Sequence, residues 1–277
     1  MYKTVERNIQ LTFKQAFPGL KGIDIFAHQL PVEPFLVITE YYMSQPVFGP
    51  HPHAGISVMT YMLPDSPIGF INRDSNGDHS IIEPGGLHIT QAGSGIHHDE
   101  FPQKPGLDAH GFQIWINHTS ENRMVSPKAI HANSDEVVQV VDEDTVVRVL
   151  LGSYHGREPV YQIVTPIQLF HVSLKAKKAI EFEAREMAFL YAIKGDGGGH
   201  EKYIPEKSIS LFSQSGDKVK VDAGEQTFDF LYATATPIKE PIVYGGPFVM
   251  TTEEQMQLTK RNYAQGKMGT LKPYHQK

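Results

Sequence analysis

Short segments with strand character recur along the whole of this chain, and turn residues separate them. Each segment is rich in Val, Ile, Phe and Tyr, whose side chains suit a pleated sheet. The 277 residues include 24 glycines and 19 prolines, more than the usual share of about 12%, and both are spread along the chain. The clearest strands are predicted at residues 35–39, 56–63, 112–116, 146–151, 167–174, 188–193 and 228–233.

The spacing of these short strands favours antiparallel sandwiches or barrels. Residues 119–141 carry little strand signal and divide the sequence into two strand-rich halves. We therefore expect an all-β protein with two tandem β-barrel domains, residues 1–130 and 131–277, packed together. Helical segments between the strands are missing, which disfavours a Rossmann-type alternation.

One short helix is predicted, from Thr251 to Gln265. Thr252 is a suitable N-cap, acidic residues occupy the first turn, and Gly266 follows as a stop signal. The preceding residues 247–250 are expected to pack this helix back across the domain interface.

Composition excludes several classes of protein. Acidic and basic residues are interspersed and give a net charge of −6, which argues against direct binding of nucleic acid. The chain has no cysteine, so disulfides and thiolate metal sites are excluded. No stretch approaches the roughly 20 apolar residues that span a bilayer, and the N-terminal residues lack the apolar core of a secretion signal. We expect a cytoplasmic protein that binds no membrane.

Histidine is concentrated in the first half of the chain. Seven of the 14 histidines lie between residues 51 and 110, more than an even spread would place there. They are His51, His53, His79, His88, His97, His98 and His110. A metal site is therefore expected in the first domain, and the second domain is expected to hold no metal ligands.

Two pairs of side chains in this region have the spacing of ligands on one face of a strand. His51 and His53 are two residues apart, as are His98 and Glu100, and side chains alternate faces along a strand. Pro52 cannot donate a ladder hydrogen bond, so the first pair belongs at a strand start or edge. Taken alone, that pair could equally be two surface histidines at a turn. All four together suit Fe, Mn, Ni, Cu or Zn and leave two positions open on an octahedral ion.

The other histidines are assigned by the same alternation. His97 cannot point inward together with His98, so it is expected on the exterior or at the pocket rim. His88 is expected in the pocket wall or behind a ligand, and His79 in solvent. His110 is expected either to line the barrel or to donate to a carboxylate behind the ligands.

Five phrases closely resemble those of the pirin family and occur in the same order over most of the chain. They are HPHAG (51–55), NRDSNGDHSIIEPGG (72–86), QAGSGIHHDEFP (91–102), HGFQIWIN (110–117) and GGPFVMTTEE (245–254). The resemblance implies a bicupin, that is, two tandem cupin (jelly-roll) β-barrels with the metal in the N-terminal one. It implies one divalent transition metal on His51, His53, His98 and Glu100. That metal is Fe²⁺ in most descriptions, although Ni, Mn, Cu, Co or Zn fits the same ligands.

The resemblance also implies two kinds of function. Some pirins oxidise quercetin with dioxygen, so we expect a quercetin 2,3-dioxygenase-type oxidoreductase acting on a small aromatic substrate and O₂. Glu100 would be its catalytic base. Other pirins are redox-responsive partners of transcription factors or metabolic enzymes, so the alternative is a metal-bound regulatory module that binds a protein. A monomer is expected for a self-packed bicupin.

The sequence departs from the family where pirins typically read HPHRGFE. Ala54 and Ser57 replace a charged pair that is expected near the mouth of the metal site. Neither residue is a ligand, so metal binding is expected to survive while substrate shape or a partner surface changes. Phe112 and Trp115 are expected to fill the core, unless one of them stacks on an aromatic substrate.

Overall fold

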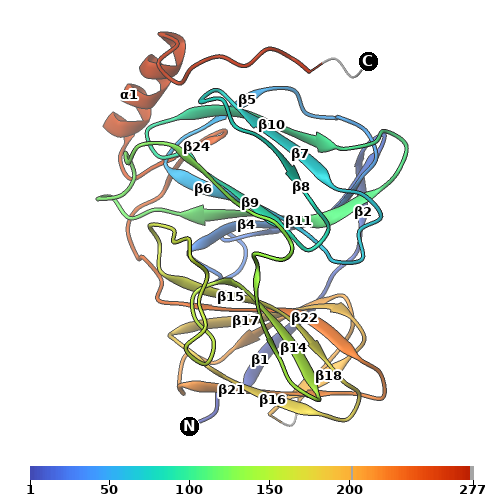
Figure 1. Cartoon of the computed structure of the whole chain (residues 1–277). Coiled ribbons are helices and arrows are strands. Elements are labelled where there is room, and N and C mark those ends of the chain that lie inside the picture. The colour runs from blue at the N-terminus through green and yellow to red at the C-terminus, as the bar shows by residue number, and fades with distance from the viewer. Residues whose placement is uncertain (201, 275–277) are drawn as a thin grey trace.

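The computed structural model describes residues 1–200 and 202–274, and nearly all of its regular structure is β. Two units lie one above the other in Figure 1, each built from a seven-stranded and a four-stranded sheet. The seven-stranded sheet of the first unit has, in spatial order, β12 (Lys128–Ala132), β9 (Leu87–Gln91), β6 (Ile56–Met62), β11 (Ala109–Asn117), β4 (Phe35–Met43), β3 (Leu20–Phe26) and β2 (Lys14–Phe17). Its four-stranded sheet has β5 (His51–His53), β10 (Ile96–Pro102), β7 (Phe70–Asp74) and β8 (His79–Ile82).

The second unit repeats this plan. Its seven-stranded sheet has β1 (Val5–Gln10), β20 (Ser208–Phe212), β17 (Met187–Lys194), β22 (Phe228–Ala235), β15 (Ile167–Leu174), β14 (Thr145–Leu151) and β13 (Val138–Val141). Its four-stranded sheet has β16 (Ala179–Glu183), β21 (Lys218–Ala223), β18 (Gly197–Gly199) and β19 (Lys202–Ile204). A hairpin of β23 (Val243–Gly245) and β24 (Phe248–Met250) precedes the helix α1 (Glu253–Ala264).

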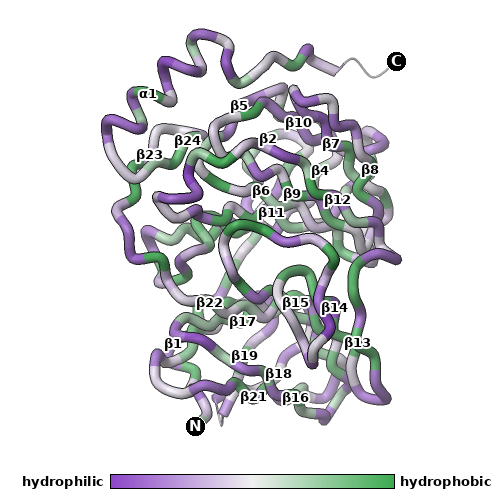
Figure 2. Tube along the Cα trace, turned by 60° about the vertical axis from the view of Figure 1, so that its left-hand side comes forward, coloured by the Kyte–Doolittle hydropathy of each residue, from purple (hydrophilic) through white to green (hydrophobic). Residues whose placement is uncertain are grey.

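Each unit is therefore a double-sheet jelly roll. The prediction of an all-β chain with two such units and one short helix near the C-terminus is confirmed, although hydrogen bonds do not close either pair of sheets into a continuous barrel. Figure 2 shows hydrophobic and hydrophilic residues alternating along many of the strands, as expected where one face is buried. Within residues 1–200 and 202–274, no helix is long and apolar enough to cross a membrane.

The first strand of the chain belongs to the second unit. β1 pairs antiparallel with β20, with Ile9 opposite Ile209, and forms one edge of the second seven-stranded sheet. Lys3, just before it, is fully buried and donates to three backbone carbonyl oxygens of that unit. The predicted first domain, residues 1–130, included this strand, whereas its pairing assigns it to the other unit. Hydrophobic and turn patterns give the position of a strand in the sequence and not the sheet edge that it joins.

The two seven-stranded sheets pack against each other around the largest apolar cluster of the molecule. Aromatic pairs cross this interface edge to face: the ring centroids of Phe35 and Phe189 are 5.3 Å apart, and those of Phe112 and Tyr191 are 5.1 Å apart. The prediction that Phe112 fills the core is confirmed. Because side chains alternate along a strand, the other face of the first sheet is left to line the interior of the first unit.

One buried carboxylate lies within this interface. Glu40, on β4, accepts hydrogen bonds from His110 Nε2 (2.8 Å), Tyr191 OH (2.7 Å) and Lys207 Nζ (2.9 Å). Burial alone would raise the pKa of Glu40, but its donors, one of them the Lys207 ammonium, lower it below its ordinary value. His110 thus donates to a carboxylate at the interface between the units.

The helix begins and ends close to where its sequence predicts. Thr252 Oγ1 accepts from the backbone N–H of Gln255 (3.2 Å), and the Gln255 side chain accepts in return from the backbone N–H of Thr252 (3.3 Å). This reciprocal pair is a capping box. Gly266 follows the last turn with φ +70°. Met256 joins Ala54 of the first unit in an apolar cluster, so the helix packs on that unit rather than across the domain interface.

Aromatic side chains fill the interior of the second unit. Phe182 stacks on Tyr232 with ring centroids 4.4 Å apart, and further phenylalanines surround them. On the other face of β16, which contains Phe182, the side chains of Glu181 and Glu183 are exposed, as expected for a solvated strand face. The interior of the second unit is therefore filled by apolar side chains.

The variant Glu40→Gln should lose about 2 kcal/mol of unfolding free energy at pH 7, because the half-buried Lys207 loses its charged hydrogen-bond partner. The folded pKa of Glu40 lies below its unfolded value near 4.5. Its contribution is therefore present above the unfolded value and is lost as the pH falls through the folded pKa. Urea unfolding of both proteins should show the difference shrinking in acid.

The exposed ion-pair residue Glu225 offers a matched control, and Glu225→Gln should change the unfolding free energy by less than about 0.5 kcal/mol at every pH. A difference between wild type and Glu40→Gln that stays constant into acid would contradict the role assigned to the Glu40 charge.

Candidate metal site

Three histidines from two neighbouring strands meet inside the first unit. β5 contributes His51 and His53, and its antiparallel neighbour β10 contributes His98, which lies opposite His51 in the register. Pro52 and His97 are also opposite each other, so both are on the other face of this sheet. β5 is the edge strand of the sheet, as Pro52 predicted.

The three imidazole rings are close enough to share one ion. Their centroids are 4.9 Å apart for His51 and His53, 4.7 Å for His51 and His98, and 5.0 Å for His53 and His98. Each ring offers one nitrogen, and the three nitrogens lie within 4.8 Å of one another. This convergence is of the kind that three imidazole ligands need around one ion, at about 2.1 Å each.

Hydrogen bonds fix the orientation of two of the rings. His51 Nδ1 donates to the carbonyl oxygen of Gly49 (2.9 Å), and His53 Nδ1 donates to that of Pro247 (3.2 Å). A carbonyl oxygen only accepts, so in each neutral ring Nδ1 carries the proton and Nε2 keeps its lone pair. A ring held at Nδ1 in this way is oriented to present Nε2 to a metal.

The third ring is the most deeply buried. His98 Nδ1 lies 3.4 Å from Thr90 Oγ1, and His98 Nε2 is buried with no hydrogen-bond partner among the described residues. Burial lowers the pKa of all three histidines, to about 3 for His53, so the imidazoles are neutral at pH 7. Three neutral imidazoles, one with an unpartnered buried nitrogen, are a donor set that fits a divalent transition metal.

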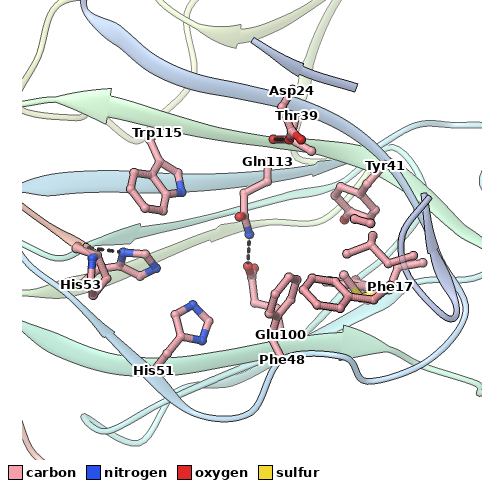
Figure 3. A pocket seen from close by; sticks show the side chains of 15 residues that line it. Phe17, Asp24, Thr39, Tyr41, Phe48, His51, His53, Glu100, Gln113 and Trp115 are labelled. Atoms are coloured by element: carbon pink, nitrogen blue, oxygen red, sulfur yellow. Dashed lines mark hydrogen bonds between the residues drawn. The ribbon is translucent and has the colours of Figure 1, made fainter. Parts of the chain in front are cut away.

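Glu100 is on the same strand as His98 but outside the group of three nitrogens. Its Oε1 accepts from Thr60 Oγ1 (2.7 Å), and its Oε2 accepts from Gln113 Nε2 (2.9 Å; Figure 3). Burial raises the pKa of Glu100 to about 7, although both hydrogen bonds oppose the shift. The structure thus brings three of the four predicted ligands together and places the fourth side chain in the wall of a cavity that His51 and His53 also line.

That cavity has a volume of about 400 Å³. Trp115 forms part of its wall, with its ring 4.9 Å from that of His53 (Figure 3), so it faces the cavity rather than the interdomain core. Phe17 and Phe48 also line it, both partly exposed, and their rings meet edge to face 5.8 Å apart. The other lining residues are mostly apolar, with Thr39 and Asp24 as polar exceptions.

The remaining histidines of this region lie elsewhere. His97 is on the outer face of β10, as predicted, with Nδ1 3.3 Å from the carbonyl oxygen of Met268. His79 is exposed, also as predicted. His88 is fully buried in the first unit, and neither of its ring nitrogens has a hydrogen-bond partner among the described residues, although Nε2 lies 4.0 Å from Asp78 Oδ2.

Ala54 and Ser57 do not lie at the mouth of the cavity, so this expectation is wrong. Ala54 is fully buried against Phe248, and Ser57 Oγ lies 2.9 Å from His118 Nε2. Alternation explains both positions: Ala54 follows the inward His53, and Ser57 has the opposite parity to Thr60 on β6. Neither side chain lines the cavity.

The sequence did not predict the groups that form hydrogen bonds with the four predicted ligand side chains. Thr60 and Gln113 lie within predicted strands, and a polar residue in an otherwise apolar strand was the available signal for them. Thr90, which follows Ile89, gave the same weak signal. The carbonyl oxygen of Pro247 had no signal, because it lies almost 200 residues from His53 in the sequence.

Two family models, both of pirins, match this chain. The Pirin family model matches residues 18–116, and the model described as Pirin C-terminal cupin domain matches residues 169–269. Pirin-1 of Arabidopsis thaliana is 31% identical over 261 residues, which cover 91% of this chain and 87% of that protein.

Solved structures agree in fold. A quercetin 2,3-dioxygenase from Acinetobacter baumannii superposes with a TM-score of 0.88 at 22% identity, covering 98% of this chain and 100% of the other. A bacterial pirin from Escherichia coli in complex with nickel(II) superposes with a TM-score of 0.64 at 17% identity, covering 83% and 99%. At these identities the likeness shows the fold alone.

Adjacent histidines on β10 provide a matched test of the site. His98→Ala should weaken binding of Ni²⁺ to the metal-free protein by more than about 100-fold, because it removes one of three converging nitrogens. His97→Ala removes an imidazole from the outer face of the same strand and should leave the affinity unchanged. Isothermal titration of tag-free protein measures both, and equal losses in the two variants would contradict the assignment.

Proposed function

This chain belongs to the pirin family, as its five phrases predicted, and from that premise we propose that it is a metal-dependent dioxygenase acting on quercetin or a similar flavonol. The observation that carries the proposal is the convergence of three imidazoles, two of which line a cavity of about 400 Å³ together with the buried carboxylate of Glu100. The name of the quercetin 2,3-dioxygenase with the same fold supports it.

We propose that His51, His53 and His98 hold one divalent transition metal, with Glu100 as the fourth ligand that the family implies. When bound, such an ion with open positions supplies Lewis acidity toward substrate oxygens and redox chemistry with dioxygen. Iron is the proposed ion on family grounds. The nickel(II) complex of the bacterial pirin supports a divalent transition metal without deciding which one.

Glu100 is proposed as the base that takes the proton of a flavonol hydroxyl. The O–H bond breaks, the proton passes to a Glu100 oxygen, and the substrate is left as the anion, which reacts more readily with dioxygen. Glu100 is held by two neutral donors, Thr60 and Gln113, and by no described cation. Burial and the absence of a neighbouring protein cation raise the proton affinity of its carboxylate, which suits a base that accepts and returns a proton.

The other walls of the cavity support an aromatic substrate. Trp115 and Tyr41 offer ring surfaces inside, and Phe17 and Phe48 offer two more with partial exposure to solvent. Burial of an aromatic body against such rings is favourable, while the few polar side chains fix its orientation.

A regulatory module would instead need its metal to change an exposed surface. His53 and His98 are almost completely buried and line or adjoin a cavity, which favours a small molecule over a protein as the group that meets the metal. The enzyme is therefore the proposal, and turnover is the property to measure.

The test is anaerobic reconstitution with Fe²⁺, addition of quercetin, and then exposure to O₂. Oxygen uptake and loss of the flavonol absorbance are expected in the wild type. Glu100→Gln should lower kcat by about 10²- to 10⁴-fold through loss of the base. Its three histidines remain, so elemental analysis should still find metal in this variant.

His98→Ala should abolish turnover, and His97→Ala should retain it. Oxygen uptake by His98→Ala equal to that of the wild type, or none by a metal-loaded wild type, would overturn the proposed reaction. The metal titration is independent of this assay, so a failed reaction would leave the metal site itself testable.

A further inference from the structure

A second cavity, of about 370 Å³, lies between the two units and shares no lining residue with the first. The segment after β6, Leu63 to Asp65, contributes one side of it. Strands β14, β15, β17 and β22 of the second seven-stranded sheet contribute the rest. Neither the family resemblance nor the proposed oxidation uses this cavity.

The hydrogen bond between Tyr61 and His171 determines which ring nitrogen of His171 carries the proton. Tyr61 OH is buried and lies 2.8 Å from His171 Nδ1, its one hydrogen-bond partner among the described residues. Burial raises the pKa of Tyr61, so the hydroxyl keeps its proton, and burial lowers the pKa of His171 to about 3, so the imidazole is neutral. The buried hydroxyl needs an acceptor, and Nδ1 is the one at hand. The ring proton is therefore on Nε2, and His171 offers an N–H donor to the cavity that it lines.

Arg148 adds a positive charge beside this donor. It lies directly opposite His171 in the register of β14 and β15, and both residues line the cavity. Its guanidinium makes no hydrogen bond or ion pair with a described residue, and its Nη1 is buried without a partner. An unpartnered cation and a neutral N–H donor at opposite positions of two neighbouring strands match a carboxylate.

Acidic side chains lie beside this pair. Asp229 is opposite Ser173 on β15, two residues along the strand from His171, which corresponds to about 7 Å. Asp65 reaches the same cavity from the first unit. Burial raises the pKa of Asp229 and the nearby Asp65 raises it further, while a hydrogen bond from Ser173 and the Lys194 ammonium oppose the shift. Lys194 also lines the cavity and lies opposite Asp229 in the register of β17 and β22, so it balances one of the two carboxylates. The other carboxylate is left to attract a positive group on a ligand.

We propose that the interdomain cavity binds a small zwitterion of the amino-acid class. Its carboxylate contacts Arg148 and His171 Nε2, and its ammonium group faces Asp229 and Asp65. The distance of about 7 Å along β15 between the positions of His171 and Ser173 suits a molecule whose two charges are separated by several carbon atoms. The ligand would contact both units, and binding would stabilise their association.

Isothermal titration of the full-length, metal-loaded protein with 4-aminobutanoate tests the proposal, with butanoate and butylamine as single-charge controls. The zwitterion should bind at least tenfold more tightly than either control. A series from 3-aminopropanoate to 6-aminohexanoate should show a length optimum. Arg148→Gln and Asp229→Asn should each weaken binding by roughly 10- to 100-fold, the range of a lost charge-assisted hydrogen bond.

Arg157→Gln, on an exposed turn, is the matched charge control and should leave binding unchanged. Melting curves of each variant establish that it is folded, since added zwitterion should raise the melting temperature of the wild type and not of Arg148→Gln. Absence of binding across the whole series, equal affinity for butanoate, or full affinity in Arg148→Gln would each overturn the proposal.

Discussion

Face-to-face packing of the two seven-stranded sheets is the contact on which the rest of the structure depends. It buries one face of the central strands of each sheet, so in the first sheet every strand except the exposed β2 contributes side chains to the interface. The alternate set is then free to be polar, and Thr60 and Gln113 come from it. A single β-sandwich with a solvated outer sheet could not have both an interior candidate metal site and a second cavity between two units.

Two buried carboxylates, one at the interface and one in the interior of the first unit, have opposite pKa shifts. Glu40 faces the interface, meets the Lys207 ammonium as well as neutral donors, and has a lowered pKa that favours the charged form. Glu100 faces the interior of the first unit and meets only hydroxyl and amide donors, so burial dominates and its pKa rises to about 7. Burial is similar at both positions, and the neighbouring charge decides the difference. One carboxylate therefore contributes to stability, while the other is suited to proton transfer.

Much of the candidate site could be predicted from the sequence because a strand has a strict period of two. That period alone placed His51, His53 and His98 on one interior and assigned His97 to the outside. It did not give the hydrogen bonds of Glu100, since these depend on which strands become neighbours. Pairing between distant segments likewise explains the errors: β1 joins the second unit, and Ala54 faces a cluster built by the C-terminal segment. Such pairings are set by tertiary packing, which local pattern does not contain.

The carbonyl oxygen of Pro247 that orients His53 belongs to a segment near the end of the chain. A ribosome makes this protein from the N-terminus, so the unit with the candidate metal site is made long before Pro247, which orients one of its imidazoles. Strand β1, made first, must likewise wait for β20 before its edge is paired. The first unit therefore gains this support of His53 only after Pro247 has been made, and the second unit gains its paired β1 edge only after β20. A product that ended before Pro247 would contain all four candidate ligands but would lack the carbonyl oxygen that orients His53.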